Sequence, residues 1–349
     1  MTGKARRTPR PPRNNGKPVL QTLMKSVKAS KPYVRRRGVL LPVFSLPSRF
    51  GIGTLGREAY KFIDILSENG ASIWAILPTG VTGYGDSPYQ SFSSFALNPY
   101  FLDLEALIEE GLLTEEECLS CDMGSDPERV DYGRLYENRI PLLMTAFARA
   151  IQSDETEEEL RAFEASAPWL SDYAEFMAIK TAMGGKPWYE WDDGLKNREP
   201  EAMARVREKL SLEIKFHKYL QMKLARQWTL LREHALRRAV LIMGDLPIYC
   251  AYDSADCWAY RENFRIDKAG RPKEVAGVPP DYFCEDGQLW GNPTYDWNRM
   301  KKEGFSFWLA RLSRAAELYD ILRIDHFRGF ASYYAVPAGA PNAREGKWR

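Results

Sequence analysis

The feature of this sequence that most constrains its fold is an alternation of short apolar runs with amphipathic helical segments. The apolar runs cover residues 38–43, 72–78, 240–245 and 319–325. Strands that are hydrophobic throughout and separated by helices are typical of a parallel sheet that is covered on both faces. We therefore predict an α/β fold with four parallel strands in the part of the chain after residue 37.

The third and fourth apolar runs each end in an acidic residue, Asp245 and Asp325. In α/β barrels the active site lies at the carboxyl ends of the strands. The fold class expected here is therefore a (β/α)₈ TIM barrel, with its chemistry near these two carboxylates.

Helical periodicity fills most of the remaining sequence. One amphipathic helix is predicted over 58–68, and a long one over 201–238 with an apolar face that includes His217. A histidine on such a face is expected to be packed and hydrogen-bonded rather than a metal ligand. The segment of about 100–235 is expected to form a helical insertion after the second strand.

The charge of the chain is unevenly distributed. Residues 1–37 hold twelve Lys and Arg and no acid, which leaves 37 basic against 47 acidic residues, a net charge of −10, in the rest. We expect 1–37 to be a basic disordered tail, with a nucleic-acid arm, a transit peptide or a polyproline ligand as alternatives. The acidic body of 38–349 argues against nucleic acid as the main partner.

Composition narrows the class further. No window approaches ~18 consecutive apolar residues, so no membrane-spanning helix is expected. Five cysteines are an odd number in a long chain, which favours a reducing, cytoplasmic compartment over a disulfide scaffold. The 10 Trp, 18 Tyr and 16 Phe residues suit a protein that stacks on sugars or bases, although an aromatic core would give the same count.

The glycines of 51–56 match the pattern G-x-G-x-x-G but not its dinucleotide-binding context. A segment containing Pro47 separates them from the first strand, and the second strand ends in Leu77-Pro78 rather than in an acid. We interpret these glycines as a tight loop that lets the backbone pass close to a neighbouring segment.

The fourth strand carries the group best equipped for chemistry. Arg323 lies two residues before Asp325 and so points to the same side of the strand, where a guanidinium favours the ionised carboxylate. An ionised Asp325 beside His326 could attack a cationic carbon. The residues alone leave a second interpretation open, an Arg–Asp pair that only holds the rim of the barrel.

Several long motifs, in the same order, resemble the amylomaltase family, the 4-α-glucanotransferases or disproportionating enzymes of the α-amylase clan. The resemblance runs from about residue 36 to the end of the chain. The matching segments are Gly38-Val39-Leu40-Leu41-Pro42, Gly85-Asp86-Ser87-Pro88-Tyr89-Gln90, Gly244-Asp245-Leu246-Pro247-Ile248-Tyr249, Val278-Pro279-Pro280-Asp281-Tyr282-Phe283, Trp290-Gly291-Asn292-Pro293 and Arg323-Ile324-Asp325-His326-Phe327-Arg328-Gly329.

The resemblance implies a role for each of these sites. It makes Asp325 the nucleophile, with Arg323 and His326 holding that carboxylate and the adjacent sugar hydroxyls. It places six further residues at the donor subsites or on a loop that covers the cleft. The donor-subsite residues are Tyr89, Asp245, Trp290 and Asn292, and the loop residues are Tyr282 and Phe283.

The resemblance also implies the reaction and its partners. The protein would transfer segments of α-1,4-glucans (maltooligosaccharides, starch- or glycogen-derived dextrins) to another glucan or glucose, with no metal or organic cofactor. Ala75, Thr79, Cys250 and Cys257 depart from residues usual in the family, close to the site rather than in its chemistry.

The acid/base Glu and a third Asp of the family lie on later strands, and the only acid after Asp325 is Glu345, outside the family motifs. We therefore expect 38–349 to be the N-terminal part of a catalytic barrel, cut short after about four strands, with no appreciable transferase activity by itself. The alternatives are an α-glucan hydrolase and a non-catalytic glucan-binding fragment.

Overall fold

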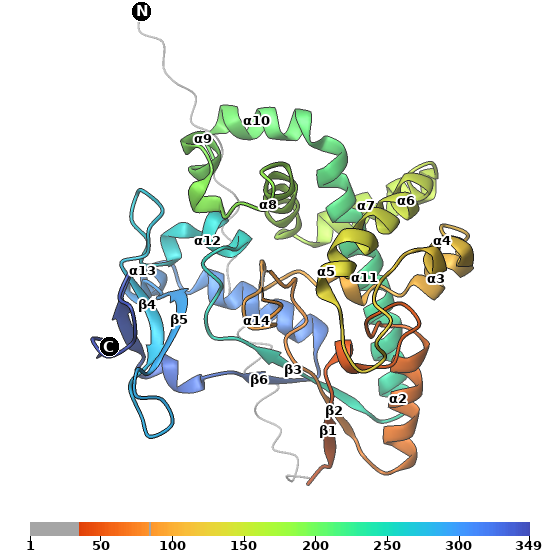
Figure 1. The fold of residues 1–349 in the computed structure, drawn as a ribbon, viewed down its shortest axis with the longest axis horizontal. Helices are drawn as coiled ribbons and strands as arrows, with labels where there is room; N and C mark the ends of the chain where they lie inside the picture. The colour runs from red at the N-terminus through yellow and green to blue at the C-terminus, as the bar shows by residue number, and fades with distance from the viewer. Residues whose placement is uncertain (1–34, 84) are drawn as a thin grey trace, which may run out of the picture. The chain divides into compact units, whose positions relative to one another are not determined.

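A computed structural model describes residues 35–83 and 85–349, so nearly all of the expected basic tail lies outside the described residues. A parallel sheet runs in the order β1-β2-β3-β6 (Figure 1). Its strands coincide with the four predicted apolar runs, although β3 extends one residue beyond its run, and this confirms the four predicted strands. They are β1 (Gly38–Leu40), β2 (Ile73–Ala75), β3 (Leu241–Leu246) and β6 (Ile321–Ile324).

The register of the sheet brings the two acidic strand ends together. Asp245 of β3 pairs with Arg323 of β6, and Leu246 pairs with Ile324. The backbone N–H of Asp325 donates to the carbonyl of Leu246 at 3.0 Å, which carries the pairing one residue beyond β6. Both carboxylates therefore lie at the same edge of the sheet.

The first helix, α2 (Arg57–Glu68), matches the predicted one and buries Ala59, Ile63 and Leu66. The glycine-rich loop before it is a close backbone approach, as expected. A Cβ on Gly53 would lie 2.0 Å from the carbonyl oxygen of Val43, so no larger residue fits there.

The segment between β2 and β3 is helical, and α8, α9 and α10 lie together at the top of Figure 1. The predicted helix over 201–238 is wrong in one respect, because the helix breaks at Leu210, which has φ −112°. The helices of this segment are α3 (Leu104–Glu109), α4 (Glu115–Ser120), α5 (Tyr132–Arg134), α6 (Ile140–Ala150), α7 (Asp154–Ser166), α8 (Leu170–Ala182), α9 (Asp193–Lys196), α10 (Pro200–Lys209) and α11 (Ser211–Arg237).

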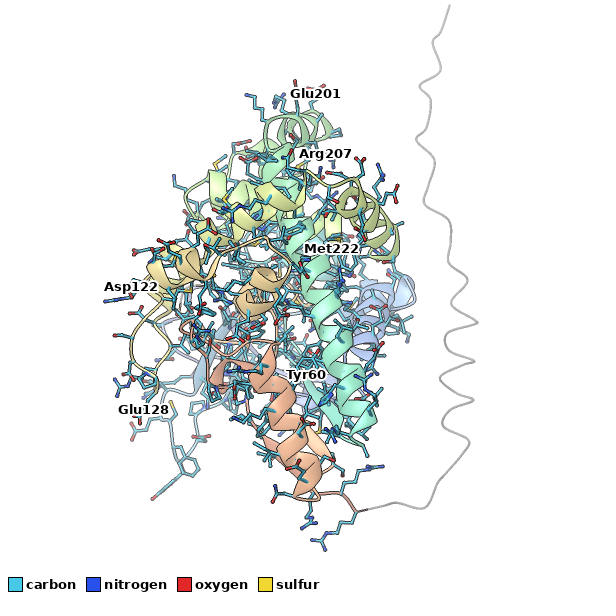
Figure 2. The ribbon with its side chains drawn as sticks, turned by 90° about the vertical axis from the view of Figure 1, so that its right-hand side faces the viewer. Tyr60, Asp122, Glu128, Glu201, Arg207 and Met222 are labelled. Atoms are coloured by element: carbon cyan, nitrogen blue, oxygen red, sulfur yellow. The ribbon has the colours of Figure 1, made fainter. Side chains whose placement is uncertain are left out.

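Helix α11 packs against α2, and Figure 2 shows the two side by side with Tyr60 of α2 labelled. The ring of Tyr60 lies 5.0 Å from that of His234 of α11. His217 of α11 is packed against Phe216 and Tyr173, as predicted. The expected hydrogen bond is missing at Nδ1, which has no partner in the described part of the chain.

A second, antiparallel sheet in the order β5-β4-β7-β8 was not predicted from the sequence, which indicated only the four parallel strands. Its strands are β4 (Glu274–Val278), β5 (Gln288–Pro293), β7 (Tyr334–Pro337) and β8 (Lys347–Trp348). The helices α12 (Ala255–Ala259), α13 (Trp297–Lys302) and α14 (Ser306–Leu318) complete this region. Among residues 35–83 and 85–349, no helix is long and apolar enough to cross a bilayer.

Candidate active site

The centre of the candidate site is a two-point ion pair between neighbouring strands. Arg323 donates from Nε to Asp245 Oδ1 at 2.9 Å and from Nη2 to Asp245 Oδ2 at 2.7 Å. The Asp245 side chain is only 2% exposed. A paired guanidinium in this fork geometry fixes both side chains, because neither can turn without losing a charged hydrogen bond.

Tyr89 joins this pair from the loop after β2. Its hydroxyl donates to Asp245 Oδ2 at 2.8 Å and accepts from Arg323 Nη2 at 3.2 Å. Burial, followed by the hydrogen bond to Asp245, raises the pKa of Tyr89 to about 12, so the phenol stays protonated near neutrality. The three side chains form one closed hydrogen-bonded triangle, which we call the Asp245–Arg323–Tyr89 triangle.

Asp325 stands beside the triangle rather than in it. Its Oδ1 lies 3.9 Å from Arg323 Nη2, and its side chain is 44% exposed. From the sequence we expected Asp325 to be the main partner of the Arg323 guanidinium, but both short hydrogen bonds of this guanidinium go to Asp245. Asp325 is thus the carboxylate of the site that a ligand can reach.

Asp325 faces a cavity of about 570 Å³. That volume lies in the usual range for small-molecule sites. The loop after β2, the segment after β3, and β5 contribute the walls. The lining residues are Ser87, Tyr89, Gln90, Pro247, Ile248, Tyr249, Leu289, Trp290, Asn292 and Asp325.

His326 has a strained backbone, with φ 50° in the left-handed region that non-glycine residues seldom adopt. Its ring lies edge-on to Trp290, with ring centroids 5.0 Å apart. Burial lowers the pKa of His326, partly offset by the charge of Asp325. The imidazole is therefore neutral at pH 7 and can donate one hydrogen bond.

The predicted binding residues separate into two sets. Trp290 and Asn292 both line the cavity, although Asn292 is 4% exposed and its amide bonds to protein on both sides. Tyr282 and Phe283 are 97% and 92% exposed on the loop between β4 and β5 and do not line the cavity. Their expected contact with a glucan stays a prediction.

Two functional candidates were missed by sequence reasoning. Gln90 lines the cavity and bonds to β5, and only its place beside Tyr89 could have drawn attention to it. Arg311 is buried on α14, where Nη2 donates to the Pro247 carbonyl at 2.6 Å and Nη1 to that of Ile248 at 3.0 Å. An arginine on the apolar face of a helix is the sequence feature that could have revealed it.

Over residues 35–83 and 85–349, no three His, Cys, Asp or Glu side chains are grouped so as to hold an ion.

The sequence model of the 4-alpha-glucanotransferase family matches residues 41–349. The chain belongs to this family. The 4-alpha-glucanotransferase of Thermus thermophilus is 49% identical over 318 residues, which cover 90% of this chain and 62% of that protein. The 4-alpha-glucanotransferase of Synechocystis sp. is 46% identical, with 90% and 63% covered. The chain thus spans less than two thirds of the length of these relatives.

Solved structures give the same result for the fold. The amylomaltase from Streptococcus agalactiae in complex with acarbose matches with a TM-score of 0.89 and 42% identity, over 90% of this chain and 64% of that one. The amylomaltase from Corynebacterium glutamicum matches with a TM-score of 0.72 at 20% identity, which bears on the fold alone. The resemblance to the amylomaltase family and the expected barrel fold class are confirmed.

Proposed function

We propose that the protein takes part in α-1,4-glucan transfer, moving a glucan segment from one maltodextrin to the 4-hydroxyl of another glucan or glucose. The observation that carries this proposal is the half-exposed Asp325 in the cavity, next to the Asp245–Arg323–Tyr89 triangle. The names of the relatives support the same reaction.

Asp325 acts as the nucleophile of a double displacement. Its carboxylate oxygen bonds to the anomeric carbon as the glycosidic C–O bond breaks, and the leaving 4-oxygen takes a proton from a second carboxyl group. The 4-hydroxyl of the acceptor then attacks the glycosyl ester, returns its proton to that second group and frees Asp325. The family resemblance assigns the second carboxyl to a strand later than β6.

The other residues hold the substrate and the nucleophile. Arg323 is fixed by Asp245, so the positive charge near Asp325 does not move during the reaction. A neutral His326 donates to a sugar hydroxyl, and the Trp290 ring offers an apolar face to the ring of a glucose unit. We place these roles in the cytoplasm, because five free thiols suit a reducing compartment.

The test is product analysis after incubation with maltotriose. The assay uses the chain alone, and the chain mixed with the part of the Thermus thermophilus relative outside the matched region. Transfer of a maltosyl unit between two maltotrioses gives glucose and maltopentaose, and further rounds give other products longer than maltotriose. Hydrolysis gives only shorter products, and the absence of turnover in both samples would contradict the proposal.

The same samples distinguish glucan transfer from a role in glucan binding without catalysis. Calorimetric binding of acarbose without any turnover in the mixture would favour it. The aromatic cavity wall could bind a glucan in either case, so binding alone does not decide between the two functions.

A further inference from the structure

A chain of two side-chain amides joins three segments around the cavity. Gln90 Nε2 donates to the carbonyl oxygen of Trp290 at 3.2 Å and to Asn292 Oδ1 at 3.0 Å. Asn292 Nδ2 in turn donates to the carbonyl oxygen of Cys250 at 2.9 Å. Gln90 lies in the loop after β2, Asn292 in β5, and Cys250 in the segment after β3.

Both ends of this amide chain are backbone carbonyls, which fixes the orientation of each amide. A carbonyl oxygen only accepts, so the Gln90 atom that faces Trp290 must be the NH₂ group. The same NH₂ group faces Asn292, which must then present its oxygen. The Asn292 NH₂ group is left to face the carbonyl of Cys250, and no flipped arrangement satisfies both ends.

We propose that Gln90 is a positioning residue that, through Asn292, sets the distance between the two walls of the glucan site. The loop of Gln90 carries Tyr89 of the triangle, and the β5 backbone that it binds carries Trp290. Locking these segments together holds the cavity at the width that a sugar ring requires. This inference rests on the proposed function only for the identity of the ligand.

The substitution Gln90→Glu tests the orientation argument with almost no change of shape. At neutral pH the introduced carboxylate opposes two acceptor oxygens, those of Trp290 and Asn292. If the Asn292 amide turned to donate to it, the amide oxygen would face the Cys250 carbonyl instead. Protonation restores one O–H donor, so the defect should diminish as the pH falls.

Two measurements compare Gln90→Glu with the unmodified protein, both as the full chain, at pH 7.5 and pH 5. Backbone hydrogen exchange of residues 288–293, corrected for its intrinsic pH dependence, shows in the absence of ligand whether the hydrogen bonds of Gln90 still stabilise this strand. Calorimetry with acarbose reports the site, and we expect binding about tenfold weaker at the higher pH, as for a buried group left unpaired. At the lower pH both readouts should move back toward those of the unmodified chain.

Two further variants make the result specific. Gln90→Met removes the donor without adding charge, so it should lose protection equally at both pH values. Gln152→Glu adds the same charge on an exposed helix end and should change nothing. Gln90→Met also serves if Gln90→Glu does not fold.

The inference is overturned if Gln90→Glu keeps full protection of 288–293 and full acarbose affinity at pH 7.5. It is also overturned if Gln90→Glu and Gln90→Met lose exchange protection and acarbose affinity equally at both pH values. Such a loss would come from side-chain packing alone and not from the hydrogen bonds of the amide. An unmodified chain that binds no acarbose would count against the proposed function, while hydrogen exchange would still decide the role of Gln90.

Discussion

At the scale of single residues, the site divides its two central aspartates between different tasks. Asp245 is buried and has both oxygens engaged by Arg323 and Tyr89, so it serves as a fixed anchor. Asp325 keeps a half-exposed carboxylate that faces the cavity. Two carboxylates at one sheet edge thus differ in exposure, because the short hydrogen bonds of the guanidinium go to only one of them.

The first prediction concerns Asp325. Asp325→Asn should bind acarbose like the unmodified protein but lose transfer by at least about 10⁴-fold, because an amide cannot form the glycosyl ester. Maltotriose conversion is measured in whichever sample turns over, the chain or its mixture with the relative's segment. Asp193→Asn, whose side chain is 85% exposed, is the control and should keep full activity. Undiminished transfer by Asp325→Asn would refute the assignment.

The second prediction concerns the fork of Arg323. Arg323→Lys keeps the charge but cannot form both hydrogen bonds to Asp245, so the Asp245–Arg323–Tyr89 triangle should loosen. We expect kcat/KM to fall by about 10²-fold, as for a misplaced catalytic group, with unchanged circular dichroism. The matched control is Arg344→Lys, an exposed partner of Asp286, which should leave the rate unaltered. A rate within twofold of normal would show that the fork is dispensable.

At the scale of helices and strands, the sequence was informative where an element is apolar throughout. The strands β1, β2, β3 and β6 were predicted from short apolar runs that alternate with helical segments. The second sheet was missed because β4 and β5 contain Gly277, Gly291 and Pro293, which are typical of turns. These strands form through antiparallel pairing with distant residues, which local pattern does not encode.

The break at Leu210 was invisible for a related reason. Apolar residues recur every three or four positions before, at and after Leu210. The sequence pattern therefore looks like a single continuous helix face, although the face is shared by two consecutive helices. In the same way, Gln90 could not be linked to Asn292, because their contact depends on a strand, β5, that was not predicted. Asp245 and Asp325 were found from the predicted strand ends, and Trp290 and Asn292 of β5 only through the family resemblance. Gln90 and Arg311 were missed.

A third prediction belongs to helix α11. Burial lowers the pKa of His217 from 6.5 to about 4. Because the unfolded chain binds this proton at a higher pH, stability is complete above about 6.5 and falls as the pH drops toward 4. The loss should reach about 3 kcal/mol of unfolding free energy.

Urea unfolding between pH 7.5 and pH 4 measures this loss. His217→Phe and His217→Gln both remove the titrating group, so each should flatten the dependence on pH whatever its effect on stability at pH 7.5. A slope equal to that of the unmodified chain in both variants would mean that other groups cause the acid sensitivity.

At the scale of the whole molecule, the parallel sheet of the described residues has two edges, β1 and β6. All three residues of β1 are exposed, and Val39 and Leu40 are 43% and 53% exposed. Apolar edge strands with unpaired backbone groups are templates for pairing with another chain. In a closed barrel each strand has two neighbours, so the edges mark where further strands would attach.

The last prediction follows from these edges. The chain alone should self-associate as its concentration rises, and Val39→Lys should reduce the association, because a charge on an edge strand opposes pairing. Sedimentation velocity across a range of concentrations measures the effect. Leu119→Lys, at a 60% exposed position on α4, adds the same charge away from the sheet and should leave the association unchanged. If both variants reduced it equally, general charge repulsion rather than strand pairing would be responsible, and a chain that stays monomeric at every concentration would show that the edges of this sheet are protected.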